Sequence, residues 1–542
     1  EDGSAVEKGR RLARLVREQR TLLILDGMEP LQYPPGEVHG FDGKLKDQGL
    51  KTLLKELAGG HPGLCVITSR EPVTDLAHKK EYTVKEMELE HLSIEAGMQL
   101  LKGLEVTGSE KEMTKAVKEY KGHALALTLL GQYIKKAYDS DIRKRDKIPS
   151  LSGRDAHAQR VMQAYEIWLK ESPELNVLRI MGLFDRPVEK GAVDALREVP
   201  SIPGVTDKFQ KLSEDDWQFA LDNLRTASLL AKKDLQKPDV LDCHPLVREH
   251  YAEQLERKNP GGWKAANLCL YRYYRALPEK ELPDTLEEME PLFAAIAHGC
   301  RAGLHQEVLD KVYYERVMRN DEESYITHKL GAYGAALAAL SHFFEIPWSR
   351  PAAGLEEESK AALFNWAAFR LRGLGRLIEA IQPMQTGLDM RVKQKDWKNA
   401  AINAGNLCEL MITLGRIREA VHYGELAVAY ADRSGSDSQK ESKRAKLAGA
   451  LHQAGQTKEA ERLFREAEEM QKERQPSFHF LYGIPGYLFS DLLLGQGKYM
   501  KVLERTEKII FMGNGLIFPF NCLPGPSHSR PGLYDGGTKG EG

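Results

Sequence analysis

The chain has 542 residues, too many for a single hydrophobic core, and corresponds to about three to five domains at roughly 100–200 residues each. Its 77 basic and 79 acidic residues nearly cancel, so no global field would draw it onto nucleic acid or a membrane surface. Six scattered cysteines without a CxxC pair, no long apolar run and no signal peptide predict a cytoplasmic protein that does not cross a membrane.

The first part of the chain has the pattern of a βαβ unit. Residues 6–20 show the spacing of an amphipathic surface helix. Continuous apolar runs at 21–25 and 64–68 predict two parallel strands, each buried between helices on both faces. A polar loop at 32–48 and a helix predicted over 49–57 connect the two strands.

Charged residues follow both predicted strands. Asp26 comes directly after the first strand, and Arg70 follows the second. Ligands bind at the carboxyl ends of strands in open parallel sheets. An acid there can hold the water shell of Mg²⁺, and an arginine can sense a terminal phosphate. Alone, an acid in this position more often belongs to a simple turn, and an arginine there is usually a solvated side chain, but the pair indicates a nucleotide site.

Residues 22–29, Leu-Leu-Ile-Leu-Asp-Gly-Met-Glu, resemble the Walker B motif of STAND ATPases of the NACHT and NB-ARC type. The resemblance implies that Asp26 organises Mg²⁺ and that Glu29 lies near the attacking water. Residues 66–70, Val-Ile-Thr-Ser-Arg, resemble the sensor strand of the family. By that likeness Arg70 faces the γ-phosphate.

Two further segments resemble motifs of the same family. Gly122-His123-Ala124-Leu125-Ala126-Leu127 is similar to the segment that opens a helix in the small helical subdomain, which implies an adenine contact by Gly122 and His123. The family usually has proline where this chain has Ala124. His244-Pro245-Leu246-Val247-Arg248 resembles the winged-helix segment whose histidine touches the β-phosphate of ADP, which assigns that role to His244. On the residues alone, His244 is equally suited to capping a helix.

A P-loop, Gly-x4-Gly-Lys-Ser/Thr, is missing from the sequence. The nearest pair, Gly43-Lys44, is followed by Leu45 and has Val38 where the first glycine belongs. The family carries its P-loop upstream of Walker B, and this chain begins with Glu1. We therefore expect a fragment truncated upstream of Walker B. ATP or ADP with Mg²⁺ would bind in the longer parent protein and weakly, with little hydrolysis, in this chain.

The middle of the chain is predicted to be a winged helix over 154–258. Apolar segments at 229–231 and 239–241 flank a charged turn, which suggests a short β-hairpin wing. A winged helix can insert a recognition helix into DNA. Here the helix predicted over 246–255 and the residue after it carry several acids, which would repel phosphates, so nucleic acid is not the expected partner.

The C-terminal part is an array of repeats. Leu-Gly-Arg-Leu-Ile-Glu-Ala at 374–380 recurs at 414–420 and, in altered form, at 454–460, with a weaker copy at 497–502. The repeated glycines are 40, 40 and 42 residues apart. Glycine can end a first helix in the left-handed conformation, and the small alanine lets the second helix approach. The pattern resembles TPR repeats, lengthened from about 34 residues by longer loops between repeats such as 432–442.

A TPR-like solenoid is expected to bind a protein or peptide on its concave face. Phe464 and Ala467 are placed as in the TPR consensus, and Gly303 marks an earlier, degenerate copy. The tail at 513–542 holds eight glycines and four prolines, a composition that predicts disorder.

The predicted fold class is α/β followed by all-α: a partial P-loop NTPase sheet, a helical subdomain and a winged helix, then a TPR-like α-solenoid. The expected domains are the back part of a nucleotide-binding domain, the helical subdomain, the winged helix, degenerate repeats, TPR-like repeats and the tail, at 1–88, 89–153, 154–258, 259–350, 351–512 and 513–542.

The resemblance implies an ADP/ATP-operated switch that forms homo-oligomers on activation, in bacterial stress or antiviral defence signalling. The alternative is a TPR scaffold or a TPR-containing transcriptional regulator without nucleotide turnover. A metabolic enzyme finds little support, since the sequence has no recognisable Ser-His-Asp, Cys-His or metal-ligand cluster.

Overall fold

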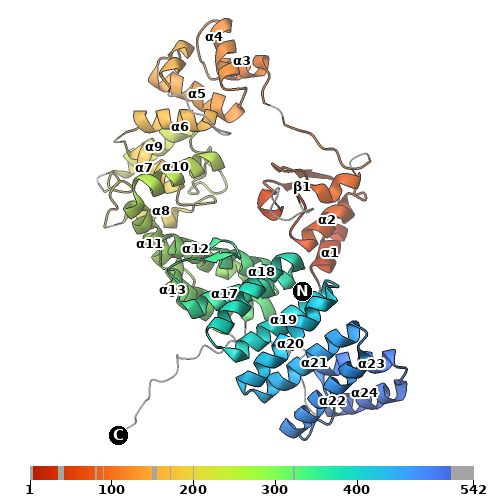
Figure 1. Ribbon diagram of the computed structural model, residues 1–542. Coiled ribbons are helices and arrows are strands. Elements are labelled where there is room, and N and C mark those ends of the chain that lie inside the picture. Colours follow the sequence, from red (N-terminus) through yellow and green to blue (C-terminus); the bar gives the residue numbers. More distant parts are fainter. Residues whose placement is uncertain are drawn as a thin grey trace, which may run out of the picture. The chain divides into compact units, whose positions relative to one another are not determined.

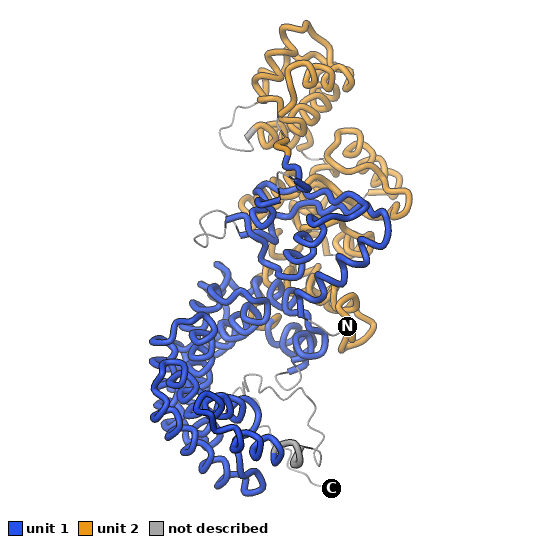
Figure 2. The backbone as a smooth tube through the Cα atoms, turned by 90° about the vertical axis from the view of Figure 1, so that its right-hand side faces the viewer, with its two compact units in different colours: residues 1–86, 309–542 blue, residues 87–308 orange. Residues whose placement is uncertain are grey.

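The computed structural model consists mostly of helices and divides into two compact units, residues 1–86 with 309–542 and residues 87–308 (Figures 1 and 2). It describes residues 4–33, 42–79, 82–89, 91–148, 156–170, 172–198, 200–210, 212–320 and 324–513. The first unit therefore combines the front segment with the C-terminal array, and the second contains the expected helical subdomain and winged helix.

The front segment folds as the predicted βαβ unit. Helix α1 (Ala5–Glu18) begins at a capping box in which Ser4 and Glu7 hydrogen-bond each other's backbone N–H groups. Strands β1 (Leu22–Leu25) and β2 (Leu64–Ile67) pair in parallel, with Leu22 opposite Leu64. Helix α2 (Gln48–Leu57) connects them and is capped by Asp47. The carboxyl ends of both strands therefore lie at one edge.

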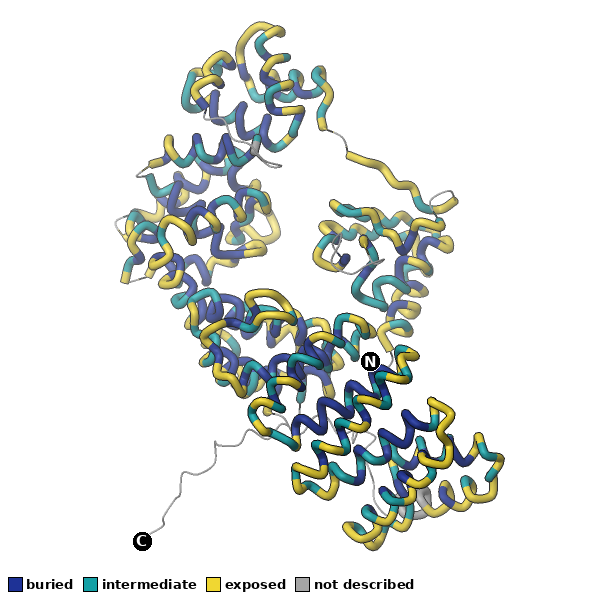
Figure 3. The backbone as a smooth tube through the Cα atoms, in the orientation of Figure 1, coloured by how far each residue is buried: buried dark blue, intermediate teal, exposed yellow. Residues whose placement is uncertain are grey.

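The prediction that both faces of this sheet are buried is wrong for the described residues. Leu23, Leu25, Cys65 and Ile67 face the core beneath α1 and α2, whereas the alternate residues point outward. Leu22, Ile24 and Leu64 are each at least 60% exposed. Side chains alternate between the faces of a strand, and helices cover only one face here. The strands thus keep the apolar composition of a doubly covered sheet but have one bare face (Figure 3).

The second unit begins with a small helical bundle. Helices α3 (Ile94–Gly103), α4 (Glu110–Glu119) and α5 (Ala124–Ala137) pack together, followed by a short 3₁₀ helix, η3 (Ile142–Lys147). Side chains at the centre of α5 are fully buried, so this bundle has a core of its own that continues into the next helices.

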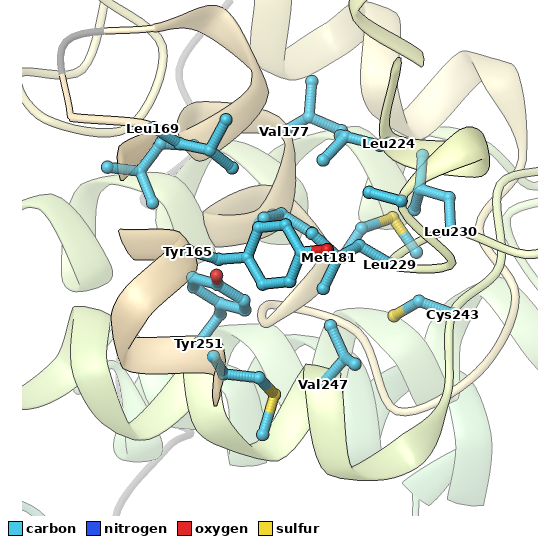
Figure 4. Close-up of a cluster of buried hydrophobic side chains, with 14 of the residues drawn as sticks. Tyr165, Leu169, Val177, Met181, Leu224, Leu229, Leu230, Cys243, Val247 and Tyr251 are labelled. Carbon is cyan, nitrogen blue, oxygen red and sulfur yellow. The ribbon is translucent and has the colours of Figure 1, made fainter. Parts of the chain in front are cut away.

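The described residues of the expected winged-helix region form five helices around one core. They are α6 (Ala156–Trp168), α7 (Pro173–Met181), α8 (Lys190–Arg197), α9 (Glu214–Thr226) and α10 (Pro245–Lys258). Tyr165 of α6, Met181 of α7 and Val247 and Tyr251 of α10 converge in this core (Figure 4).

The wing is smaller than the sequence predicted. The N–H of Ala231 donates to the carbonyl of Asp242 at 2.7 Å, but Leu241 pairs with Val188 in an isolated antiparallel bridge. The segment between, 232–239, is exposed and mostly polar, and it contains Pro238, which cannot donate a backbone hydrogen bond. It is therefore poorly suited to pair as a β-hairpin.

A helical stretch links the second unit to the array. It comprises α11 (Pro260–Ala276), α12 (Leu286–Arg301), α13 (His305–Val308), the π-helical η4 (Leu309–Met318), α15 (Tyr325–His328) and α16 (Tyr333–Ser341). Gly303 lies at φ +88° between α12 and α13, as expected of a degenerate repeat turn. A short antiparallel pair, β3 (Phe344–Ile346) and β4 (Arg350–Pro351), was not predicted.

The array consists of four helix hairpins that stack in a curved row (Figures 1 and 2). The hairpins are α17 (Glu357–Gly373) with α18 (Leu377–Lys393), α19 (Trp397–Thr413) with α20 (Ile417–Ser434), α21 (Asp437–Gln453) with α22 (Thr457–Arg474), and α23 (Gly483–Gly495) with α24 (Tyr499–Gly513). The TPR-like solenoid is thereby confirmed as a fold.

The expected long loop at 432–442 is wrong. Helix α20 continues to Ser434, Gly435 turns the chain at φ +69°, and α21 starts at Asp437. The extra length of the repeats therefore lies in the helices, most of which have 17 or 18 residues. Charged residues at helical spacing, such as the Lys440–Asp437 pair, let this polar sequence continue as helix.

The tail predicted to be disordered, 513–542, lies outside the described residues except for Gly513, which ends α24.

Candidate functional site

The carboxyl edge of the sheet brings Asp26 next to Thr68. The Thr68 hydroxyl donates a short hydrogen bond to Asp26 Oδ1 and accepts the N–H of Gly27 at 2.9 Å. The N–H of Met28 then donates to the Thr68 carbonyl at 3.0 Å. Thr68, which directly follows β2, thus fixes the turn after β1. The Asp26 carboxylate stays exposed at the sheet edge.

Glu29 and Arg70 meet at the same edge. Glu29 Oε1 accepts the backbone N–H of Arg70 at 2.7 Å and lies 4.0 Å from the Arg70 Nε. The side chain of Arg70 is 71% exposed, whereas that of Glu29 is 32% exposed. The guanidinium therefore points largely into solvent, where an anion can reach it. The structure brings all three residues predicted for Mg²⁺ and phosphate to one edge.

Gln32 holds this edge together, and the sequence analysis did not single it out. Its side chain is 1% exposed. Its amide donates to the carbonyls of Gly43, Glu71 and Pro72 at 3.0–3.2 Å, and its oxygen accepts from the Ser69 hydroxyl. Gln32 thereby ties the loop after β1 to the loop that carries Arg70. A glutamine in a polar loop carries no sequence signal for such burial.

The same loop contacts the first hairpin of the array within the first unit. The Tyr33 hydroxyl donates to Glu379 Oε1 of α18 at 2.5 Å. Arg376 holds the same carboxylate through two bonds of 2.8 and 2.6 Å and lies over the Tyr33 ring at 5.8 Å. Burial and the Glu379 carboxylate raise the pKa of Tyr33 above its usual value, so the phenol stays a proton donor at physiological pH. This contact joins the candidate nucleotide-binding segment to the repeat array.

In the second unit, His123 caps α5. Its Nδ1 accepts the N–H of Ala126 at 3.3 Å, and its ring lies 5.7 Å from that of His91. Gly122 precedes it at φ +67°, and a Cβ there would lie 2.2 Å from the Leu92 carbonyl oxygen. The turn therefore requires glycine. The predicted opening of a helix at this segment is confirmed.

His244 caps α10 in the same way. Its Nδ1 accepts the N–H of Leu246 at 3.2 Å, and Pro245 occupies the first turn, where its missing N–H costs nothing. Arg248, next along the segment, is 7% exposed and pairs with Asp242. The capping interpretation of His244 is thus observed. Its predicted phosphate contact stays a prediction, as does the adenine contact of Gly122 and His123.

Other features of the described residues limit the chemistry. No group of three or more His, Cys, Asp or Glu side chains gathers there as a metal site. Across the same residues, no helix is both long and apolar enough to span a membrane. A cavity of about 250 Å³ in the second unit is lined by residues including Lys136, Tyr165 and Asn223, and by none of the predicted site residues.

No family model and no curated protein matches the chain. Among solved structures, it is similar to a Signal Transduction ATPase with Numerous Domains (STAND) protein with a tetratricopeptide repeat sensor from Pyrococcus horikoshii. The identity is 15% and the TM-score 0.37, and the match covers 95% of this chain and 78% of that chain.

Two structures of the TPR-like repeats of a kinesin light chain from Podosopora anserina also match. They show 16% and 15% identity, TM-scores of 0.24 and 0.23, and 41% coverage of this chain; the match covers 94% and 92% of those chains. With TM-scores this low, function has to be inferred from the residues of this chain.

Proposed function

We propose that the chain is part of a STAND-type signalling NTPase, in which an ADP/ATP-operated switch is coupled to a TPR-like sensor array. The observation that carries the proposal is the convergence of Asp26, Glu29 and Arg70 at the carboxyl edge of parallel strands β1 and β2. An acid, a second acid and an exposed arginine at this edge are the groups that Mg²⁺ and a terminal phosphate require.

The residues present fit Mg²⁺ but supply only part of a nucleotide site. Asp26 is an exposed oxygen donor whose orientation Thr68 fixes, which suits a hydrated Mg²⁺ held through water. Arg70 can reach an anionic oxygen. The phosphate-cradling amides and lysine of a P-loop have no counterpart in the sequence. We therefore expect nearly empty protein and negligible hydrolysis from residues 1–542 alone, and binding in the longer parent protein.

The bare sheet face supports the same conclusion. Leu22, Ile24 and Leu64 would together bury a large apolar surface if further strands and helices covered them, and exposing them to water is costly. Parallel sheets occur almost only with both faces covered. A two-stranded parallel sheet is best explained as part of a larger nucleotide-binding sheet.

His244 is suited to the switch contact. Because its Nδ1 accepts a helix N–H, the proton of a neutral ring would lie on Nε2, the donor that the proposal assigns to a phosphate oxygen. We propose that ADP, bound in the parent, is held through this donor in the resting state. Exchange for ATP then releases the winged-helix region, and the parent assembles into homo-oligomers.

The alternative, a DNA-binding winged helix, is less favoured by α10. Arg248 is buried against Asp242, so it cannot reach a phosphate backbone. The exposed residues of this helix include Glu249, Glu253 and Glu256, whose charges repel DNA. A TPR scaffold without nucleotide turnover remains the competing function, and nucleotide content separates the two.

The test is nucleotide retention by the parent protein, expressed with the sequence upstream of Glu1, and by residues 1–542. Both are denatured, and released ADP is quantified by ion-exchange chromatography. We expect near-stoichiometric ADP from the parent, little from residues 1–542, and loss of ADP from the parent on His244→Ala. A parent protein that releases no ADP and lacks a P-loop would contradict the nucleotide-operated switch and favour the TPR scaffold.

A further inference from the structure

The cavity of about 250 Å³ in the second unit has an apolar floor. Residues of α5, α6, α7 and α9 line it, and the floor includes Tyr165, Leu224 and Leu229, each at most 1% exposed. Figure 4 shows these three side chains within the core of the unit. An apolar cavity of about 150 Å³ can hold benzene. The larger space here therefore admits an aromatic ring that carries a short substituent.

Trp168 of α6 lines the same cavity at its solvent side. It is 42% exposed, whereas Tyr165, one turn earlier on the helix, is fully buried. The two rings lie 6.2 Å apart at an interplanar angle of 66°. A further aromatic ring can pack edge-to-face or offset against such a pair, and it would remove apolar surface of Trp168 from water. The lining thus favours an aromatic occupant.

Two opposite charges lie beside this cavity, on either side of Asn223. Lys136 Nζ donates to the backbone carbonyl of Asn223 at 2.7 Å, and Asn223 Nδ2 donates to Glu174 Oε1 at 3.0 Å. All three residues line the cavity and are half-buried. An ammonium has three hydrogens and a carboxylate has two oxygens, so each of these bonds uses only part of the capacity of its charged group.

The two charges determine which occupant the cavity tolerates. Burial lowers the pKa of Lys136, and the Glu174 carboxylate opposes this. A ligand that fills the cavity removes further water from both groups, which is costly unless the ligand supplies opposite charges. A ligand with a single charge compensates one of the two groups. A ligand that carries an ammonium and a carboxylate close together compensates both.

We propose that this cavity binds a free α-amino acid with an aromatic side chain. The ring occupies the floor beside Tyr165 and Trp168, the carboxylate contacts Lys136, and the ammonium contacts Glu174. An apolar floor with a few polar groups at its edge is the arrangement typical of small-ligand sites. Every residue that lines the cavity belongs to the second unit, so the site does not depend on the proposed nucleotide switch.

The test uses residues 1–542 and three fluorinated probes that differ only in charge. They are 4-fluoro-L-phenylalanine, 3-(4-fluorophenyl)propionate, which lacks the ammonium, and 2-(4-fluorophenyl)ethylamine, which lacks the carboxylate. Broadening of the ligand's ¹⁹F NMR signal measures affinities into the millimolar range. We expect the amino acid to bind, and each analogue to bind roughly tenfold more weakly, the effect of losing one charge-assisted hydrogen bond.

Two variants assign each charge of the ligand to its partner. Lys136→Met should weaken the amino acid roughly tenfold and bind the amine no more weakly than wild type does. Glu174→Gln should weaken the amino acid similarly and bind the propionate no more weakly. A general loss of structure would weaken all three probes together, so this crossed pattern distinguishes a ligand contact from a structural role.

Lys135→Met is the matched control. Lys135 is the neighbouring residue of α5, its side chain is 40% exposed and pairs with Glu105, and it does not line the cavity. The change in net charge is the same as in Lys136→Met, and we expect wild-type binding. Circular dichroism melts show whether each variant folds. If Lys136→Met does not, Glu174→Gln and the propionate carry the test.

Three results would overturn the proposal. Equal affinities for the three probes would contradict recognition of both charges, and an equal loss in Lys135→Met and Lys136→Met would show a general effect of charge. The absence of broadening for every probe at millimolar concentration would contradict the site itself.

Discussion

At the scale of single residues, the candidate nucleotide edge depends on Thr68. Its hydroxyl is shared between the Asp26 carboxylate and the N–H of Gly27. The same residue bonds Leu25 and Met28 through its backbone, so β2 sets the direction in which Asp26 leaves β1. A carboxylate held this way loses little freedom when it binds a cation.

Thr68→Val is expected to weaken this edge without disturbing the strand, since valine has the same shape and a strand preference of its own. Losing a hydrogen bond to an ionised group should lower Mg²⁺-dependent ATP affinity of the parent protein by roughly tenfold. Thr68→Ser, which keeps the hydroxyl, should behave like wild type. Titration with a fluorescent ATP analogue measures both, and an unaffected valine variant would show that the hydroxyl has no role.

His250 makes stability depend on pH. Burial lowers the pKa of His250 from 6.5 to about 4, with the Glu166 carboxylate opposing, and its Nε2 is a buried atom without a hydrogen-bond partner among the described residues. The unfolded chain therefore binds a proton between about pH 6.5 and 4 that the folded chain does not, so stability is full above this window and falls with the pH inside it.

His250→Leu should flatten that dependence. At pH 7 the free energy of unfolding of the variant is expected to be close to that of wild type. At pH 5 the free energy of unfolding of wild type should be lower by up to about 2 kcal/mol because of His250, since each pKa unit corresponds to about 1.4 kcal/mol. Urea unfolding followed by tryptophan fluorescence at both pH values measures the difference. Parallel losses in wild type and variant would assign the pH dependence to other groups.

At the scale of elements, the turns of the array repeat one conformation. Gly375, Gly415, Gly455 and Gly497 all have φ between +70° and +77°. Around Gly415 and Gly455, no atom lies within 4 Å of an added Cβ, so the requirement for glycine there comes from the backbone alone. The alanines of three repeats, Ala380, Ala420 and Ala460, are fully buried against the preceding helix.

Gly415→Ala should therefore destabilise the array by about 1–2 kcal/mol, the strain of a left-handed alanine. Gly495→Ala is the control, because Gly495 has an ordinary helical conformation and its nearest atom, His452 Nε2, is 3.6 Å from the added Cβ. That variant should be neutral or slightly more stable. Thermal melts by circular dichroism compare the two variants. An equal Tm would contradict the claim that the left-handed backbone at Gly415 requires glycine.

The sequence predicted those elements whose signal is local. The two strands, the capped helix α2 and the helix hairpins of the array follow from apolar period and glycine placement. The prediction failed for the segment 432–442, because a polar, charged helix has no apolar period to distinguish it from a loop. It failed also for the outer sheet face. An apolar run predicts that both faces of a strand are suited to burial, but it does not show whether other elements cover them.

At the scale of the whole molecule, the predicted site is divided between two units. Asp26, Glu29 and Arg70 belong to the first, and His123 and His244 to the second. The long-range contacts that matter within the first unit, those of Gln32 with residues 69–72 and of Tyr33 with Glu379, link residues 37 to 346 positions apart. No local pattern encodes such pairs, so the sequence could name the acids and the arginine but not what positions them.

The central claim is that Asp26 binds the Mg²⁺ of a bound nucleotide, and the most direct test is the Mg²⁺ dependence of ATP affinity in the parent protein. A fluorescent ATP analogue is titrated into wild type and Asp26→Asn, each in Mg²⁺ and in EDTA. We predict that EDTA weakens wild type strongly, and that Asp26→Asn in Mg²⁺ binds no better than wild type in EDTA. An equal Mg²⁺ effect in both proteins, or no binding in any condition, would contradict the account.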